Sequence, residues 1–411
     1  MDLVETVGYI GQELHFLDES TFAFQVGNGI ALYDTAKGIK EIMWKFAIDD
    51  KGEEVLGIKA FCVNWEKKLF AVAKKGGVLE VYNLIFSEGS TTVSSRVFTM
   101  TTESLGGNAT IDIESLSFSW NGDRIYALTG VMKSYLLIWE LSDGVGSETE
   151  LVVSHKLSQT FTKVIPNPVQ PDFFALHSKS RGVVQVGYIN EILRTFSIKM
   201  LPVEPELDAV AKKKVNFALW LPGTSLLLGC DSGHMIQVNC SKALSELDVR
   251  LLGCYKYMGA AVVPVKAALT VSHLILATAD CTTYWFSLDT GNLGNSPTTN
   301  ATSATLNIDI AAPVTQVCQL AEGDGARPRL SSLALDKGFS KVLMGTTDGR
   351  ILMVDVEVVE QPQVEDEDHK SGDDTEVAKS IISPVLVANE AARGVTLCSQ
   401  PLLMNVKKVG V

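Results

Sequence analysis

The chain has 411 residues, with 48 acidic and 35 basic side chains and a formal net charge of −13. This acidic balance disfavours binding to nucleic acid or to other polyanions. A hydrophobic fraction of 46% with only 20% charged residues indicates that most of the chain folds, as one large or two medium domains.

The cysteines and the apolar segments give no sign of secretion or of a membrane anchor. The seven cysteines are scattered without CxxC spacing, which disfavours a disulfide framework and a zinc site and favours a reducing compartment. The N-terminus "MDLVETVGYIGQELHF" lacks a basic segment followed by an apolar core, so no secretory signal is expected. The apolar stretch from Met258 is interrupted by Pro264, Lys266 and His273, and we interpret it as buried strands rather than a membrane span.

One pattern recurs along the chain: an apolar strand, a polar turn, a second strand, a short Gly or Asp turn, and a third strand. We count seven copies, whose starts lie roughly 45 to 65 residues apart, near the length of a four-stranded propeller blade. The first four copies are "LHFLDESTFAFQVGNGIALYDT" from Leu14, "IKAFCVNWEKKLFAVAKKGGVLEVYNL" from Ile58, "IESLSFSWNGDRIYALTGVMKSYLLIWEL" from Ile113 and "FTKVIPNPVQPDFFALHSKSRGVVQVGYI" from Phe161. The last three are "VNFALWLPGTSLLLGCDSGHMIQVNC" from Val215, "VPVKAALTVSHLILATADCTTYWFSL" from Val263 and "LSSLALDKGFSKVLMGTTDGRILMVDV" from Leu330.

These copies predict an all-β, seven-bladed, WD-repeat-like β-propeller. The strands are too short for helices, and several four-stranded sheets packed around an axis bury faces that one sheet leaves exposed. The segments "ELVVSHKL" from Glu150 and "LRTFSIKML" from Leu193 alternate as outer fourth strands do. Turns between second and third strands are predicted at five positions, where Gly supplies the backbone conformation: Gly77, Asp231, Gly233, Asp348 and Gly349.

The domain boundaries follow from the repeats and from a change in composition. We assign residues 1–357 to the propeller, 358–377 to a flexible acidic linker and 378–411 to a short C-terminal extension. That extension is either a closing strand or the start of a truncated second propeller. Ring closure needs a strand from one end of the chain, and we favour the N-terminal "LVETVGYI" over "IISPVLVA" from Ile381.

No group of residues in the sequence has the spacing of a catalytic, cofactor or metal site. The six histidines occur in different repeats without HxH or HxxxH pairs, and no phosphate-binding loop or nucleophile elbow is present. The acidic run from Glu365 to Glu376 lacks the order of ligands found in a calcium loop. We therefore expect no catalytic residues, no cofactor and no metal.

Two sets of side chains recur at corresponding places in the repeats. Lysines cluster in loops of one rim of the ring, where they could meet an acidic partner or simply keep strand ends soluble: Lys74, Lys75, Lys212, Lys213 and Lys214. Aromatic residues fall near the ends of third strands, where we expect packing between blades: Tyr33, Tyr82, Trp139, Tyr188 and Phe286.

The strand endings "IWEL" at Ile138, "LYDT" at Leu32 and "MVDV" at Met353 resemble eroded WD-repeat endings. The order "GYIGQELHFLDESTFAFQVGNGIALYDT", "FAVAKKGGVLEVYNL", "ESLSFSWNGDRIYALTG" with "YLLIWEL", and "WLPGTSLLLGCDSGHMIQVN" is similar to the N-terminal propeller of WD-repeat cilia- and flagella-associated proteins. The resemblance spans roughly Gly8 to Val356. Members of that family typically continue into a second propeller and a coiled coil, whereas the present sequence ends after "LLMNVKKVGV" without heptads.

The resemblance implies a noncatalytic scaffold in the cytoskeleton of the ciliary or flagellar axoneme, linking dynein motor and doublet microtubule. The partners it implies are a sister WD-repeat protein, an inner dynein and tubulin, with no nucleic acid and no membrane. Two other functions stay open from the residues: a WD-repeat scaffold of a cytosolic trafficking or ubiquitin-ligase complex, and a propeller hydrolase. The hydrolase would need carboxylates or histidines converging on the channel, whereas the inner strands show mainly Ser, Val, Leu and Phe.

Overall fold

The structure is a computed structural model of the whole chain. It describes the following residues: 9–18, 20–26, 29–34, 39–44, 57–87, 90–102, 111–130, 134–141, 149–190, 195–200, 214–221, 223–243, 246–256, 264–269, 273–279, 283–287, 315–318, 329–336, 341–347, 349–355 and 384–389. Within these ranges every regular element is a β-strand. The acidic linker, the Asn/Ser/Thr-rich insert from Thr290 and the last residues of the chain lie outside them.

The strands form seven four-stranded antiparallel sheets, the blades, each made of four consecutive strands. Blades 1 and 2 contain β1 (Tyr9–Phe16), β2 (Thr21–Val26), β3 (Gly29–Asp34), β4 (Ile39–Trp44), β5 (Ile58–Asn64), β6 (Leu69–Lys74), β7 (Val78–Ser87) and β8 (Ser90–Thr101). Blades 3 and 4 contain β9 (Ile113–Phe118), β10 (Arg124–Thr129), β11 (Tyr135–Glu140), β12 (Glu150–Lys156), β13 (Lys163–Pro166), β14 (Phe173–Ser178), β15 (Val183–Asn190) and β16 (Thr195–Met200).

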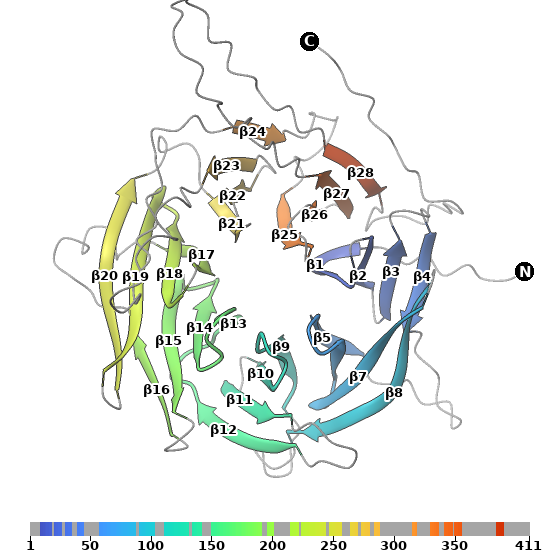
Figure 1. Ribbon diagram of the computed structural model, residues 1–411, viewed down its shortest axis with the longest axis horizontal. Helices are drawn as coiled ribbons and strands as arrows, with labels where there is room; N and C mark the ends of the chain where they lie inside the picture. Colours follow the sequence, from blue (N-terminus) through green and yellow to red (C-terminus); the bar gives the residue numbers. More distant parts are fainter. Residues whose placement is uncertain are drawn as a thin grey trace, which may run out of the picture.

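Blades 5 and 6 contain β17 (Val215–Trp220), β18 (Ser225–Cys230), β19 (His234–Ala243), β20 (Glu246–Lys256), β21 (Pro264–Leu269), β22 (His273–Thr278), β23 (Thr283–Ser287) and β24 (Thr315–Cys318). Blade 7 contains β25 (Leu330–Leu335), β26 (Lys341–Thr346), β27 (Arg350–Asp355) and β28 (Pro384–Asn389). The sheets follow one another around a ring, with the first strand of each blade innermost (Figure 1). The predicted all-β, seven-bladed, WD-repeat-like propeller is therefore confirmed, as are the predicted outer strands β12 and β16.

The second strand of each blade carries most of the core. Strands β2, β10, β14 and β18 are buried at all six positions, whereas the outer strand β12 is buried at only one position. A second strand has a neighbouring blade against each face, so both sets of its alternating side chains are covered. This explains why the repeats show continuous apolar runs such as "LLLGC" instead of alternation.

The blades are joined by apolar clusters that each draw on two adjacent sheets. Four of the predicted aromatic residues, Tyr33, Tyr82, Trp139 and Tyr188, are buried in such clusters. Trp139 of blade 3, for example, packs in one cluster with side chains of blade 2. The prediction that these aromatics pack between blades is confirmed, while the side chain of Phe286 lies outside the described set.

Ring closure differs from the interpretation favoured on the sequence. The fourth strand of blade 7 is β28, which pairs with β27 and comes from the C-terminal segment, not from the N-terminal one. Blade 1 is complete by itself from β1 to β4, so it has no strand position left to share. The first and last blades instead meet through apolar side chains, among them Phe24 and Tyr33 of blade 1 with Leu343 of blade 7. The ring therefore closes by packing between sheets.

The apolar stretch from Met258 forms the strands β21 and β22, which pair with each other as antiparallel neighbours. In the part of the chain that the structure describes, no helix is long and apolar enough to cross a membrane.

Candidate functional site

Charged side chains from three blades meet in the central channel of the ring. Glu13 lies on the inner strand β1 of blade 1, and Lys163 lies on the inner strand β13 of blade 4. The Lys163 Nζ donates to Glu13 Oε1 over 2.5 Å, although 150 residues separate them in sequence. Strands β1 and β13 lie on opposite sides of the central opening (Figure 1), so this ion pair spans the channel. It is a contact that only ring closure can create.

The surroundings hold Glu13 in its ionised form. Burial within the ring opposes ionisation, but the charges of Lys163, His15 and Lys266 outweigh it and lower the pKa of Glu13 to about 2. The side chains of Glu13 and Lys163 are nevertheless 44% and 43% exposed, since the channel itself admits water. The pair is therefore partly hydrated, and solvent screens it in part.

Two further channel groups, His15 and Lys266, are less well satisfied. Burial lowers the pKa of His15, so its imidazole is neutral at pH 7. Its Nε2 atom is buried without a hydrogen bond and lies 3.8 Å from Glu13 Oε2. Lys266, on β21 of blade 6, makes no hydrogen bond or ion pair with any residue that the structure describes. Burial and the charge of Lys163 lower the pKa of Lys266 to about 8.

The groups next to this cluster are held by the fold and offer little reactivity. Burial and the Glu13 carboxylate raise the pKa of the Cys62 thiol well above its ordinary value, which leaves the thiol protonated. His177 Nε2 donates to the backbone oxygen of Val215 over 3.0 Å, and burial lowers the pKa of His177. Gln25 makes the corresponding bond from blade 1 to Ile58 of blade 2. Both side chains are the fifth residue of a second strand, so they fasten neighbouring blades.

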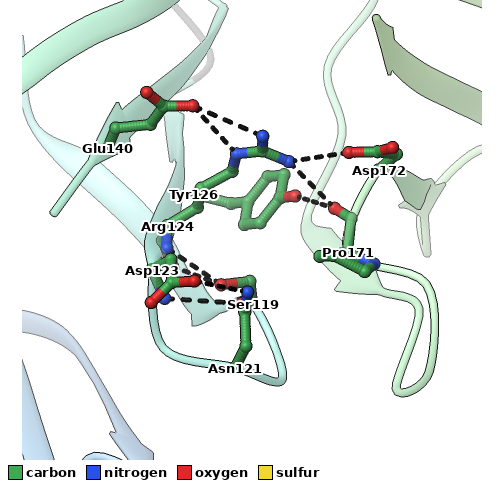
Figure 2. Close-up of polar contacts among 8 residues, drawn as sticks. All are labelled: Ser119, Asn121, Asp123, Arg124, Tyr126, Glu140, Pro171 and Asp172. Carbon is green, nitrogen blue, oxygen red and sulfur yellow. Dashed lines mark hydrogen bonds and ion pairs between the residues drawn. The ribbon is translucent and has the colours of Figure 1, made fainter. Parts of the chain in front are cut away.

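A second polar network joins blades 3 and 4 near the opposite end of the ring (Figure 2). Arg124 is only 5% exposed and contacts the carboxylates of Glu140 at 3.3 Å and Asp172 at 3.1 Å. Its guanidinium and the hydroxyl of Tyr126 both donate to the backbone oxygen of Pro171. The turn between β13 and β14 is thus locked onto the strand β10 of the preceding blade.

Two large apolar side chains are exposed on the turns that this network holds together. Trp120, in the turn from β9 to β10, is 54% exposed, and Val169, in the turn from β13 to β14, is 59% exposed. Both turns connect a first to a second strand, so they lie at the same end of the ring. Their backbones are fixed by Asn64, which donates to Trp120 O, and by Asn167, whose Oδ1 accepts from Val169 N. We call Trp120 and Val169 the exposed apolar pair.

The predicted rim lysines have different surroundings. Lys74 pairs with Glu80 at 2.5 Å and is largely covered, whereas Lys75 and Lys214 are exposed. The loops of Lys75 and Lys214 lie at the end of the ring opposite the exposed apolar pair, in the β6–β7 turn of blade 2 and directly before β17 of blade 5. Lys212 and Lys213 lie outside the described residues. Whether any of them binds an acidic partner stays a prediction.

The predicted turn residues lie where second strands meet third strands. Gly77, Gly233 and Gly349 have positive φ angles of 74°, 75° and 89°. At Gly77 a Cβ atom would also lie 2.6 Å from the backbone oxygen of Ile111, so a side chain has no room. Asp231 Oδ1 accepts from the backbone nitrogen of Lys214. Asp348 is not among the described residues.

The charged channel cluster was not predicted from the sequence. Glu13 lies one residue before the first repeat as we counted it, and Lys163 and Lys266 are single cations in otherwise apolar inner strands. The two lysines can be recognised from the residues with which they pair on the neighbouring second strands. Lys163 pairs with His177 and Lys266 pairs with Ala277, which are the fifth residues of their second strands. Aligning the repeats on their second strands would have placed both lysines at equivalent channel positions.

No group of acidic, histidine or cysteine side chains able to hold a metal ion occurs among the described residues. No protein-family model matches the chain, and no curated protein matches it. Among solved structures, the chain is similar to the beta-propeller domain of Cps50 (Swd1) from Myceliophteria thermophila, with 15% identity and a TM-score of 0.50. The match covers 74% of this chain and 83% of that one. At this identity the likeness shows the propeller fold alone.

Proposed function

We propose that this protein is a noncatalytic scaffold that binds other proteins, and that the exposed apolar pair is one of its contact surfaces. The observation that carries the proposal is the combination of Trp120 and Val169, more than half exposed, with turns locked by Arg124. Tryptophan on a rigid support is typical of the residues that dominate binding energy at protein interfaces. A preorganised turn also loses little conformational entropy on binding.

The charges around the pair favour a partner segment with an apolar anchor beside a basic residue. Asp123, Glu140 and Asp172 are partly exposed at this place, where Asp123 pairs with Lys67 and the other two pair with Arg124. Asp123 and Glu140 are still 51% and 44% exposed, so a cation of a partner can reach both carboxylates. A lysine or arginine next to the anchor of the partner would therefore be attracted to the rim of the surface.

The partner that we infer is a protein of the ciliary or flagellar axoneme. The support is the similarity of the repeat order to the WD-repeat cilia- and flagella-associated proteins. On this proposal the propeller docks between doublet microtubule and inner dynein, together with a sister WD-repeat protein, and helps to regulate motility. The ring supplies a rigid body, and the turns of blades 3 and 4 supply a contact.

The test is the behaviour of the tagged full-length chain in a flagellated cell. We expect the protein to stay on demembranated axonemes and to be released with an inner dynein at high salt. The double variant Trp120→Ser with Val169→Ser should instead enter the detergent-soluble fraction. Val97→Ser is the matched control, since Val97 is an exposed valine on the outer strand β8 and should leave retention unchanged.

Two outcomes would contradict these proposals separately. A wild-type protein found only in the detergent-soluble cytoplasm would overturn the axonemal assignment. Retention of the double variant equal to that of wild type would overturn the role of the exposed apolar pair. Both substitutions are at exposed positions, so we expect the variants to have the same thermal midpoint as wild type. Equal midpoints would show that the fold is intact.

A further inference from the structure

The channel cluster carries more positive than negative charge. Lys163 and Lys179 both act electrostatically on Lys266, and the carboxylate that acts on it is that of Glu13. Three cations against one anion leave an excess of +2 when all three lysines are protonated. This excess stands out in a chain whose formal net charge is −13. Lys179 is exposed directly after β14, at the end of the channel where the inner strands begin.

Lys266 is the channel lysine that has no hydrogen-bond partner among the described residues. Glu13 is engaged by Lys163, and Lys266 makes no hydrogen bond or ion pair with a residue that the structure describes. The inner strands packed on either side of β21 are β17 "VNFALW" and β25 "LSSLAL", and neither contains a charged residue or a histidine. Across the channel, the buried His15 Nε2 also lacks a hydrogen bond. A buried polar atom without a partner costs free energy that a bound ligand can recover.

We propose that the central channel binds a carboxylate group between Lys266 and Lys163, reached from the end of the ring that carries Lys179. The pairing of Lys163 with Glu13 already shows a carboxylate held by a channel lysine, with Lys163 Nζ 2.5 Å from Glu13 Oε1. The two side chains are 44% and 43% exposed, so solvent reaches the site. Exposed Lys179 adds attraction for an anion at the opening.

A carboxylate fits this site better than a phosphate group. The channel already holds a carboxylate, that of Glu13, on Lys163, and the three cations are lysines, which act as point charges. Glu13 stays ionised within the cluster because its pKa is about 2. Each carboxylate bound would neutralise one unit of the excess charge.

Binding should depend on pH in a way that identifies Lys266. Burial, together with the charges of Lys163 and Lys179, lowers the pKa of Lys266 to about 8 against the opposing charge of Glu13. Affinity should therefore be full below pH 7 and should fall as the pH rises through 8, while exposed lysines still carry their charge. Conversely, a bound carboxylate should raise the pKa of Lys266. His177 and His15 are neutral over this range because burial lowers the pKa of each.

The experiment is a calorimetric titration of the full chain with succinate at pH 7 and low salt. We expect saturable binding that Lys266→Met weakens at least tenfold, and that Glu13→Gln strengthens severalfold because it frees Lys163. Lys75→Met is the matched control, an exposed lysine at the same end of the ring that should leave the affinity unchanged. Equal affinity of wild type and Lys266→Met would overturn the proposal. Equal weakening by Lys75→Met would do the same, because it would indicate attraction by the overall field.

A second measurement uses the unmutated side chain. After mild reductive ¹³C-methylation, the NMR signal that disappears in Lys266→Met reports the titration of this lysine. We expect a midpoint that rises when succinate is added, and an unchanged midpoint at saturating succinate would contradict the site.

The source of the carboxylate is distinguished by comparing ligands. Tighter binding of succinate than of a glutamate-rich peptide would assign the site to a free metabolite. Tighter binding of the peptide, lost in its glutamine counterpart, would assign it to an acidic side chain of a protein. The site stands apart from the proposed function, since Trp120→Ser with Val169→Ser should leave succinate binding intact. Failure of one proposal is thus distinguishable from failure of the other.

Discussion

The network around Arg124 allows a direct test of how neighbouring blades are joined. The perturbation is Arg124→Met, which keeps an unbranched side chain of similar reach but removes the guanidinium. The variant loses the contacts to Glu140 and Asp172 and one of the two hydrogen bonds to the oxygen of Pro171. The hydroxyl of Tyr126 still donates to that oxygen over 2.9 Å, so the Pro171 oxygen keeps a hydrogen bond.

The loss of stability in Arg124→Met depends on how well water can solvate the two carboxylates that lose the guanidinium. Removing one member of a fully buried ion pair costs about 3 to 5 kcal/mol, because the remaining charge stays buried. Here Glu140 is 44% and Asp172 is 31% exposed, so water can solvate both carboxylates after the substitution. The loss is then that of charge-assisted hydrogen bonds, and we expect about 2 kcal/mol of destabilisation. With an unfolding entropy of about 2.1 cal/mol/K per residue over the chain, this lowers the thermal midpoint by roughly 2 °C.

The assay is differential scanning calorimetry, combined with hydrogen exchange of the turn between β13 and β14. Arg250→Met is the matched control: Arg250 is 76% exposed and pairs with Asp248, so its loss should cost less than about 1 kcal/mol. We expect Arg124→Met alone to lower the midpoint and to speed exchange in the turn. Equal midpoints for the two variants, or a more stable Arg124→Met, would refute the assignment of this network as a fastening between blades.

Three further predictions concern the core and the channel. Leu343→Ala should destabilise the ring by about 3 kcal/mol and increase hydrogen exchange in blade 1, because Leu343 of blade 7 is fully buried where blades 1 and 7 meet. Unchanged hydrogen exchange in blade 1 would contradict ring closure by packing between these two blades. Gly229→Ala would place a Cβ atom 1.9 Å from Phe217 Cε1 and should lower the free energy of unfolding, measured in urea, by about 2 kcal/mol or more. Gly130→Ala should not, because the three atoms nearest to its Cβ belong to the side chain of Glu114, at 3.3 Å or more. The contribution of Glu13 to stability should be present above pH 4.5 and lost as the pH falls toward 2, because its folded pKa is lowered to about 2. In Glu13→Gln, the urea midpoint should therefore fall less between pH 6 and pH 3 than it does in wild type.

Much of the fold could be predicted because each blade repeats the same local pattern. Turn glycines such as Gly233 and continuous apolar runs such as that of β18 mark the strands without any knowledge of the partners. Ring closure could not be predicted this way. The segments at both ends of the chain have strand-like sequences, and only the completeness of blade 1 decides that β28, and not the N-terminus, joins β27.

The polar sites were harder to predict because their residues meet only after the ring has formed. The contact between Glu13 and Lys163 joins residues 150 positions apart, and no spacing rule connects them. The exposed apolar pair was missed for a related reason. Trp120 and Val169 occupy turns, where sequence periodicity ends, and their exposure depends on how blades 3 and 4 are joined.

The measurement that tests the central claim most directly is photo-crosslinking from position 169 in a flagellated cell. A photoreactive amino acid replaces Val169, and a second version carries it at Lys75, at the opposite end of the ring. We predict crosslinks from position 169 to an axonemal protein, lost when Trp120 is changed to Ser and absent from position 75. Absence of any crosslink from position 169, or the same products from both positions, would contradict a partner seated on the turns of blades 3 and 4.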